Sequence, residues 1–115
     1  MNGGHNFWEY IKTYKEVIKV GRETYREVIF DLYMSRDWQL GWTKYDPKRY
    51  YKSPRPLKGI KADSATRLGI SQMLSWIAKN ELKMPVHKSL NMLLDNEDTV
   101  IKIERDLTLY KILSK

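Results

Sequence analysis

Residues 7–32 read FWEYIKTYKEVIKVGRETYREVIFDL, and the spacing of their apolar and small residues predicts a helix. These residues follow one another at alternating intervals of four and three positions, as on one face of a helix. The series is Phe7, Ile11, Tyr14, Ile18, Gly21, Tyr25, Val28 and Leu32. Asn6 stands three residues before Glu9, which resembles a capping box. We therefore expect a long amphipathic helix within residues 1–40, beginning at residue 6 or 7.

The apolar stripe of this helix needs a partner, because such a helix is long for a chain of 115 residues. The partner is the rest of the chain, a second copy or a different protein, and a homodimer through this helix is one expected arrangement. Gly21 in the stripe predicts that another backbone passes close by. The candidate protein-contact residues are Ile11, Tyr14, Ile18, Gly21, Tyr25 and Val28.

Length and composition indicate one compact globular domain, with 42% hydrophobic and 30% charged residues. The chain contains no cysteine, which excludes disulfides, thiolate metal ligands and cysteine nucleophiles. No apolar run approaches the roughly 18 residues of a membrane span, and the start MNGGHNFWEYIK does not read as a secretion signal. We expect a soluble, intracellular (cytoplasmic) protein that does not contact a membrane.

Positive charge is concentrated in residues 41–61. This segment has seven basic residues against one acidic residue, and supplies +6 of the net charge of +7. Residues 1–40 are neutral overall, and residues 62–115 carry +1. Pro47, Pro54 and Pro56 interrupt the basic segment and predict extended or turn geometry. Residues 41–61 are therefore expected to form a basic extended arm.

The basic arm also carries aromatic residues, and this combination favours nucleic acid as the partner. Lysine and arginine neutralise phosphates, while aromatic rings stack on bases. The candidate nucleic-acid-binding residues in the arm are Trp42, Lys44, Tyr45, Lys48, Arg49, Tyr50, Tyr51, Lys52, Arg55, Lys58 and Lys61. Two alternatives stay open: the tyrosines pack on the domain while the lysines are merely solvated, or the arm binds an acidic protein surface. No amphipathic helix accompanies the cluster, which argues against a membrane.

Residues 62–115 predict a helical segment followed by a β-hairpin. The expected order is a helix split at Gly69, a break at residues 83–85, a short helix over 86–94 and a hairpin turning near residues 105 and 106. This order resembles the winged helix-turn-helix superfamily over residues 62–113. The resemblance implies that the short helix reads bases through His87, Lys88 and Asn91, and that Lys102 or Arg105 lies near phosphate. A plain helical core with a hairpin is the alternative.

No catalytic motif or metal-ligand spacing occurs in the sequence. His5 and His87 are far apart, and the glycines form no phosphate-binding loop. The acidic cluster Asp95, Glu97 and Asp98 is expected to cap or turn the chain. We expect a mainly α (α+β) protein without cofactor or metal that binds DNA or RNA and is not an enzyme. The alternative is an accessory or inhibitory protein, including one encoded by a virus, that docks on a larger protein or ribonucleoprotein assembly.

Overall fold

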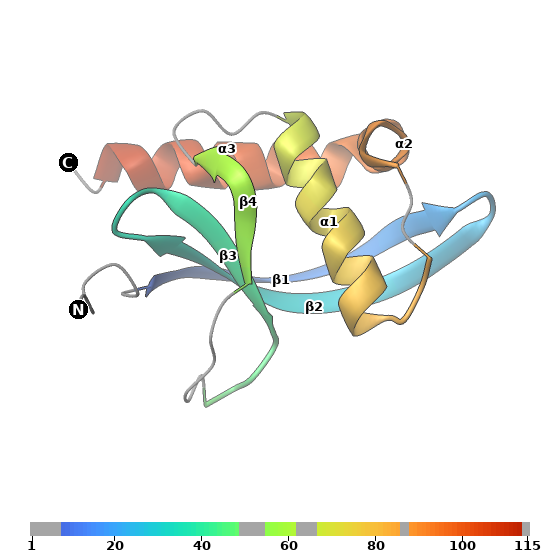
Figure 1. Cartoon of the computed structure of the whole chain (residues 1–115), viewed down its shortest axis with the longest axis horizontal. Coiled ribbons are helices and arrows are strands. Elements are labelled where there is room, and N and C mark those ends of the chain that lie inside the picture. Colours follow the sequence, from blue (N-terminus) through green and yellow to red (C-terminus); the bar gives the residue numbers. More distant parts are fainter. Residues whose placement is uncertain (1–7, 49–54, 62–66, 86–87, 114–115) are drawn as a thin grey trace. The chain divides into compact units, whose positions relative to one another are not determined.

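A computed structural model describes residues 8–48, 55–61, 67–85 and 88–113 of the chain, as four strands followed by three helices (Figure 1). The elements are β1 (Trp8–Gly21), β2 (Thr24–Ser35), β3 (Gln39–Lys44), β4 (Arg55–Lys61), α1 (Arg67–Glu81), α2 (Ser89–Asp95) and α3 (Glu97–Leu113). The strands form one sheet in the order β1-β2-β3-β4, and the pairs β2–β3 and β3–β4 are antiparallel. None of the described helices combines the length and the apolar character that crossing a bilayer requires.

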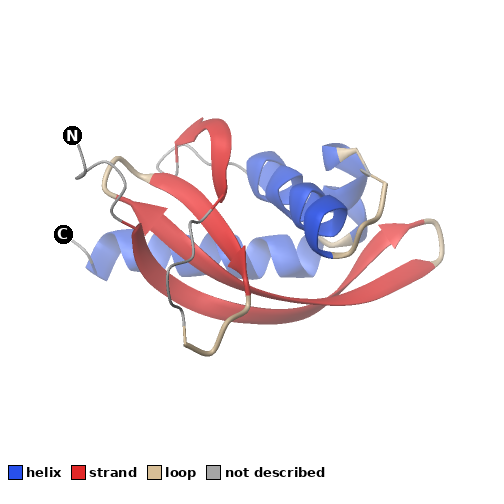
Figure 2. Ribbon diagram, turned by 60° about the horizontal axis from the view of Figure 1, so that its bottom comes forward, coloured by secondary structure: helices blue, strands red, loops and turns tan. Residues whose placement is uncertain are grey.

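The predicted N-terminal helix is wrong, because β1 and β2 form a long hairpin in its place (Figure 2). β1 has the period of a strand from Tyr14 to Val20, with even positions turned inward. Glu16 occupies one of these inward positions, so the alternation of apolar and polar residues is broken in the sequence. The residues at intervals of three and four then look like a helical stripe. Arg22 and Glu23 form the turn, without the Asn-Gly or Asp-Gly pair typical of short hairpins.

The basic segment 41–61 is not an extended arm, because both of its ends belong to strands. β3 and β4 pair with Gln39 opposite Lys61 and Trp42 opposite Arg55, and the register shifts between Gln39 and Gly41. The strand order makes β4 an edge of the sheet. A proline is tolerated on an edge strand because its missing N–H removes no hydrogen bond from the sheet interior. This explains how Pro56 fits within β4.

The predicted C-terminal hairpin is also wrong, because α3 occupies residues 97–113. Val100, Ile103 and Leu107 are buried at helical spacing, whereas Leu109 and Ile112 are exposed. Because of these exposed apolar residues, the apolar positions of the segment are spread around a helical wheel, and the buried face of the helix cannot be recognised from the sequence. Residues 97–113 therefore form no wing, and the resemblance to winged helix-turn-helix proteins does not hold. A short helix, α2, does lie within the expected range, and α1 continues through Gly69 instead of breaking there.

Residue contacts group the chain into two compact units. Unit 1 consists of residues 1–15 and 29–64, and unit 2 consists of residues 16–28 and 65–115, so β1 and β2 contribute to both. In unit 1 the rings of Tyr14 and Phe30 stack with centroids 5.3 Å apart. Among the described residues of unit 1, Leu32, Met34, Leu40 and Trp42 are also large and fully buried. The largest buried residues of unit 2 are Ile18, Ile70, Met73, Leu74 and Ile77.

Within unit 2, polar side chains join strand β1 to the helices. Asn96, between α2 and α3, accepts a hydrogen bond from the Lys19 backbone N–H at 2.7 Å and donates one to the Lys19 carbonyl at 2.9 Å. Glu16 accepts hydrogen bonds from Thr99 Oγ1 at 3.1 Å and from Lys102 Nζ at 2.9 Å. These contacts give hydrogen-bond partners to the inward carboxylate of Glu16 and to the backbone of Lys19 on the edge strand β1.

Candidate nucleic-acid interface

The connection that leaves β3 begins with cationic and aromatic side chains that face solvent. Lys44 and Lys48 are exposed, and 41% of the Tyr45 surface is accessible. The backbone N–H of Tyr45 donates a hydrogen bond to the carbonyl of Ile29 at 3.2 Å, and Asp46 Oδ1 accepts one from the backbone N–H of Lys48 at 3.0 Å. The second bond is typical of a turn in which an aspartate holds the backbone two residues ahead. The backbone at this point is therefore held while the side chains stay accessible.

Strand β4 adds the basic residues Arg55, Lys58 and Lys61 beside β3. The antiparallel register places Arg55 opposite Trp42 and Lys61 opposite Gln39, so these two residues pair with the first four residues of β3. Asp46 is the only acidic residue from position 38 to position 62. The basic residues at the start of the connection and on β4 thus share one β-hairpin of unit 1, which we call the basic hairpin (residues 39–61).

The remaining predicted nucleic-acid contacts fall into three groups. Trp42 is only 2% exposed, so its ring belongs to the buried core of unit 1 and is not accessible to a nucleic acid. Lys88 and Asn91 are exposed in unit 2, just before and within α2. The rest of the predicted set, Arg49, Tyr50, Tyr51, Lys52 and His87, lies outside the described residues.

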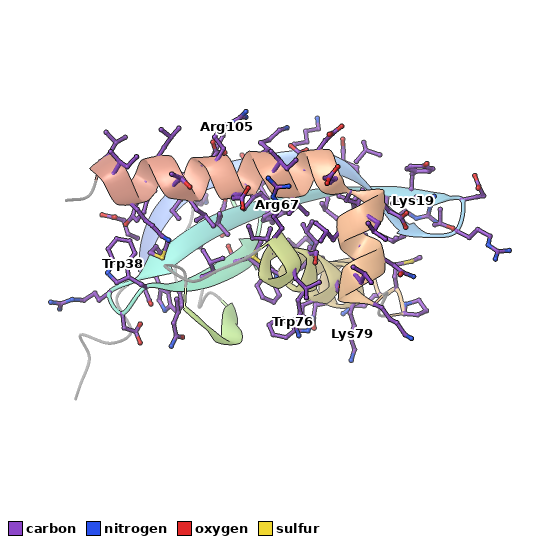
Figure 3. The ribbon with its side chains drawn as sticks, turned by 90° about the horizontal axis from the view of Figure 1, so that it is seen from above. Lys19, Trp38, Arg67, Trp76, Lys79 and Arg105 are labelled. Atoms are coloured by element: carbon purple, nitrogen blue, oxygen red, sulfur yellow. The ribbon has the colours of Figure 1, made fainter. Side chains whose placement is uncertain are left out.

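The two cations expected on the wing lie on helix α3. Lys102 Nζ pairs with Glu16 Oε2 at 2.9 Å, which places this ammonium group in an internal contact of unit 2. Arg105 is exposed on the same helix (Figure 3). The roles that the winged-helix resemblance implied for them have no structural basis in this fold.

The predicted protein-contact residues of the first forty positions lie on strands. Tyr14, Ile18 and Val28 are buried, so they fill the core of this chain and offer no surface to a second copy. The N-terminal helix through which we expected a homodimer does not form, because these residues lie on strands, and a homodimer itself stays a prediction. The described residues do not show the close backbone approach that we expected at Gly21, since among them a Cβ there would meet only the side chain of Thr24, at 3.8 Å. Of the six residues, only Tyr25 is largely exposed.

Sequence reasoning missed Trp38, which lies in the turn between β2 and β3 (Figure 3). Its φ angle of 63° lies in the left-handed region, which few residues other than glycine adopt. The side chain is 36% exposed and Arg36 beside it is also exposed. In the sequence this position is marked only by the tripeptide Arg36-Asp37-Trp38, and so short a pattern does not predict a binding site.

Unit 2 contains a surface groove of about 370 Å³. Its walls include the exposed side chains of Val17, Tyr25 and Leu94. Its rim includes Asp95, Glu97 and Asp98, and Asp95 Oδ1 lies 3.9 Å from Lys19 Nζ. An apolar wall with an acidic rim suits a protein segment that carries both apolar and basic side chains.

Across the described part of the chain, no three histidine, cysteine, aspartate or glutamate side chains gather so that they could hold a metal ion. A buried carboxylate, Asp31, lies on β2, and Thr13 Oγ1 donates a hydrogen bond to its Oδ1 at 2.5 Å.

No protein-family model matches this chain, and no curated protein or solved structure is significantly similar to it. Functional conclusions therefore depend on the residues of this chain alone.

Proposed function

We propose that this protein is a non-catalytic nucleic-acid-binding protein that contacts DNA or RNA through the basic hairpin. The observation that carries the proposal is the concentration of seven basic residues against one acidic residue in positions 41–61. The pairing of β3 with β4 supports it, because this pairing gathers the charge on two neighbouring strands and their connection. The proposal requires no cofactor, and it assigns the protein to the interior of the cell, in keeping with its lack of cysteine.

Nucleic acid fits the basic hairpin better than other polyanions do. Tyr45 stands exposed between Lys44 and Lys48, and neither lysine makes an ion pair with a described residue. Such cations are available to phosphates, and the ring is available to a base. A membrane surface is usually bound by an amphipathic helix, whereas the described parts of this segment are strands and a turn.

The test compares wild type with a hairpin variant in which Lys48, Arg49, Lys52 and Arg55 are changed to alanine. Binding is titrated against duplex DNA, single-stranded DNA and RNA at two salt concentrations. Seven phosphate contacts predict a log–log salt slope of about −6 on duplex, and the variant is expected to bind more weakly with a slope of about −3.

A matched control removes the same charge from exposed positions outside the hairpin. It changes Lys15, Arg22, Lys79 and Arg105 to alanine, none of which makes an ion pair with a described residue. We expect the control to keep most of the affinity and the steep salt slope, because long-range attraction is screened within about 10 Å at 0.1 M salt. Equal affinity for wild type and the hairpin variant, or an equal loss in the control, would reject the proposal.

The second candidate function is docking on a larger protein or ribonucleoprotein assembly as an accessory or inhibitory factor. The groove of unit 2 favours it, because Tyr25 and Leu94 expose apolar surface beside an acidic rim. Size-exclusion chromatography with a cell extract, with and without nuclease, separates the two functions. A complex that survives nuclease and is lost when Tyr25 and Leu94 are changed to serine supports docking. Release of the bound material by nuclease supports the first function.

A further inference from the structure

The groove of unit 2 brings together exposed apolar and aromatic side chains from three elements. Val17 comes from β1, Tyr25 from β2 and Leu94 from α2, and each is more than half exposed. They surround a space of about 370 Å³. Single exposed apolar residues are ordinary on a protein surface, whereas several that line one concave surface are typical of a contact site. The groove is therefore a candidate site for a partner with an apolar side chain.

The rim of the groove determines which charge its occupant carries. Glu97 and Asp98 lie in the first turn of α3, and neither makes an ion pair with a described residue. Asp95 adds a third carboxylate, with Lys19 Nζ at 3.9 Å from its Oδ1 (Figure 3). Acidic residues also stabilise the first turn of a helix, so by themselves they do not indicate a partner. Beside exposed apolar walls, they favour an occupant that combines an apolar side chain with basic ones.

This chain itself carries such a segment where β3 ends, at residues 44–48, which we call the basic connection. The side chain of Tyr45 is 41% exposed and stands in the sequence between the exposed residues Lys44 and Lys48. Neither lysine makes an ion pair with a described residue. Two hydrogen bonds hold the backbone, from Tyr45 N–H to the carbonyl of Ile29 at 3.2 Å and from Lys48 N–H to Asp46 Oδ1 at 3.0 Å. A segment that is already held in place loses less conformational entropy when it binds.

We infer that the groove of one copy of this chain binds the basic connection of a second copy. Tyr45 packs between the apolar walls, and Lys44 and Lys48 lie against the carboxylates of the rim. The two surfaces differ, so the contact is heterologous, and copies add to one another head to tail. A contact of this size is smaller than a standard protein interface, so the assembly is weak, and salt weakens it further. The inference does not rest on the proposed function, because the contact needs no nucleic acid.

Sedimentation equilibrium tests this contact on nuclease-treated protein, so that nucleic acid cannot bridge two copies. The average mass of the wild type should rise above the 13.7 kDa of one chain as its concentration approaches about 1 mM, and should rise less in about 1 M salt.

Two variants each remove one of the two surfaces. The groove variant changes Tyr25 and Leu94 to serine, and the connection variant changes Lys44 and Lys48 to glutamate. Each should associate at least about tenfold more weakly than the wild type. A matched control, with the exposed residues Lys15 and Lys79 changed to glutamate, alters the charge equally outside both surfaces and should associate like the wild type.

Mixing the groove variant with the connection variant tests the geometry of the contact. The connection variant keeps an intact groove and the groove variant keeps an intact connection, so an equimolar mixture should form a dimer and nothing larger. The substituted positions are exposed, so urea unfolding should give the wild-type midpoint for both variants. If a double variant is less stable than the wild type, Leu94→Ser or Lys44→Glu alone replaces it in the mixture.

Three results would overturn the inference. The first is a wild type that stays monomeric, which leaves the groove to a different protein. The second is a mixture of the two variants that does not associate although the wild type does. The third is a control variant that loses as much association as the connection variant, because overall charge and not these residues would then cause the assembly.

Discussion

Changing Asn96 to alanine is expected to lower the free energy of unfolding more than any other single asparagine substitution among the described residues. Asn96 is only 7% exposed and bonds both the N–H and the carbonyl of Lys19, at 2.7 and 2.9 Å. Its Nδ2 also lies 3.1 Å from the carbonyl of Met92. Because β1 is an edge strand, this side chain performs for Lys19 the role that a neighbouring strand performs elsewhere in the sheet.

The magnitude follows from the bonds that are lost. A hydrogen bond contributes about 1 kcal/mol net, and a buried partner that is left unsatisfied costs about 1–3 kcal/mol. Lys19 is half-buried, so water replaces part of what its backbone loses. We therefore expect Asn96→Ala to lower the free energy of unfolding by about 2–4 kcal/mol. This is a large share of the roughly 5–15 kcal/mol typical of a domain.

Urea unfolding followed by circular dichroism measures this change, and amide exchange at Lys19 locates it. The matched control is Asn80→Ala. Asn80 is exposed, and among the described residues its side chain bonds only the Trp76 carbonyl of its own helix, at 2.7 Å, so we expect a change within about 0.5 kcal/mol. Equal stability losses for the two variants, with unchanged protection of the Lys19 amide, would show that Asn96 does not anchor β1.

Three more substitutions test the core and the sheet. Gly21→Ala should change the free energy of unfolding by no more than about 0.5 kcal/mol, measured by urea unfolding, because the added Cβ has only an ordinary contact at 3.8 Å. Glu16→Gln should lower it by about 1–2 kcal/mol, and a double-mutant cycle with Lys102→Met should reveal a coupling of about 0.5–3 kcal/mol. A coupling near zero would mean that the pair is not formed. Trp42→Ala should lower the free energy of unfolding by about 3–5 kcal/mol as a core substitution, so a fully stable Trp42→Ala protein would place the ring outside the core.

Charge distribution and the position of the middle helices could be predicted from the amino-acid sequence. The excess charge of residues 41–61 depends only on composition, and a helix that ends before the break at residues 83–85 follows from local apolar spacing. The basic hairpin was identified as a charged segment but not as a pair of strands. Its proline content argued for an extended arm, whereas Pro56 lies on an edge strand that tolerates it.

The two errors in secondary structure have the same physical origin, which is that apolar spacing is ambiguous without knowledge of the partners. In the first strand, Glu16 faces inward because Thr99 and Lys102, more than eighty residues later, receive its carboxylate. In the last helix, exposed Leu109 and Ile112 conceal the buried stripe. The local sequence contains the apolar residues and the charges of each segment. Whether a segment becomes strand or helix was settled by distant side chains, because only they satisfy an inward charge or a free strand edge.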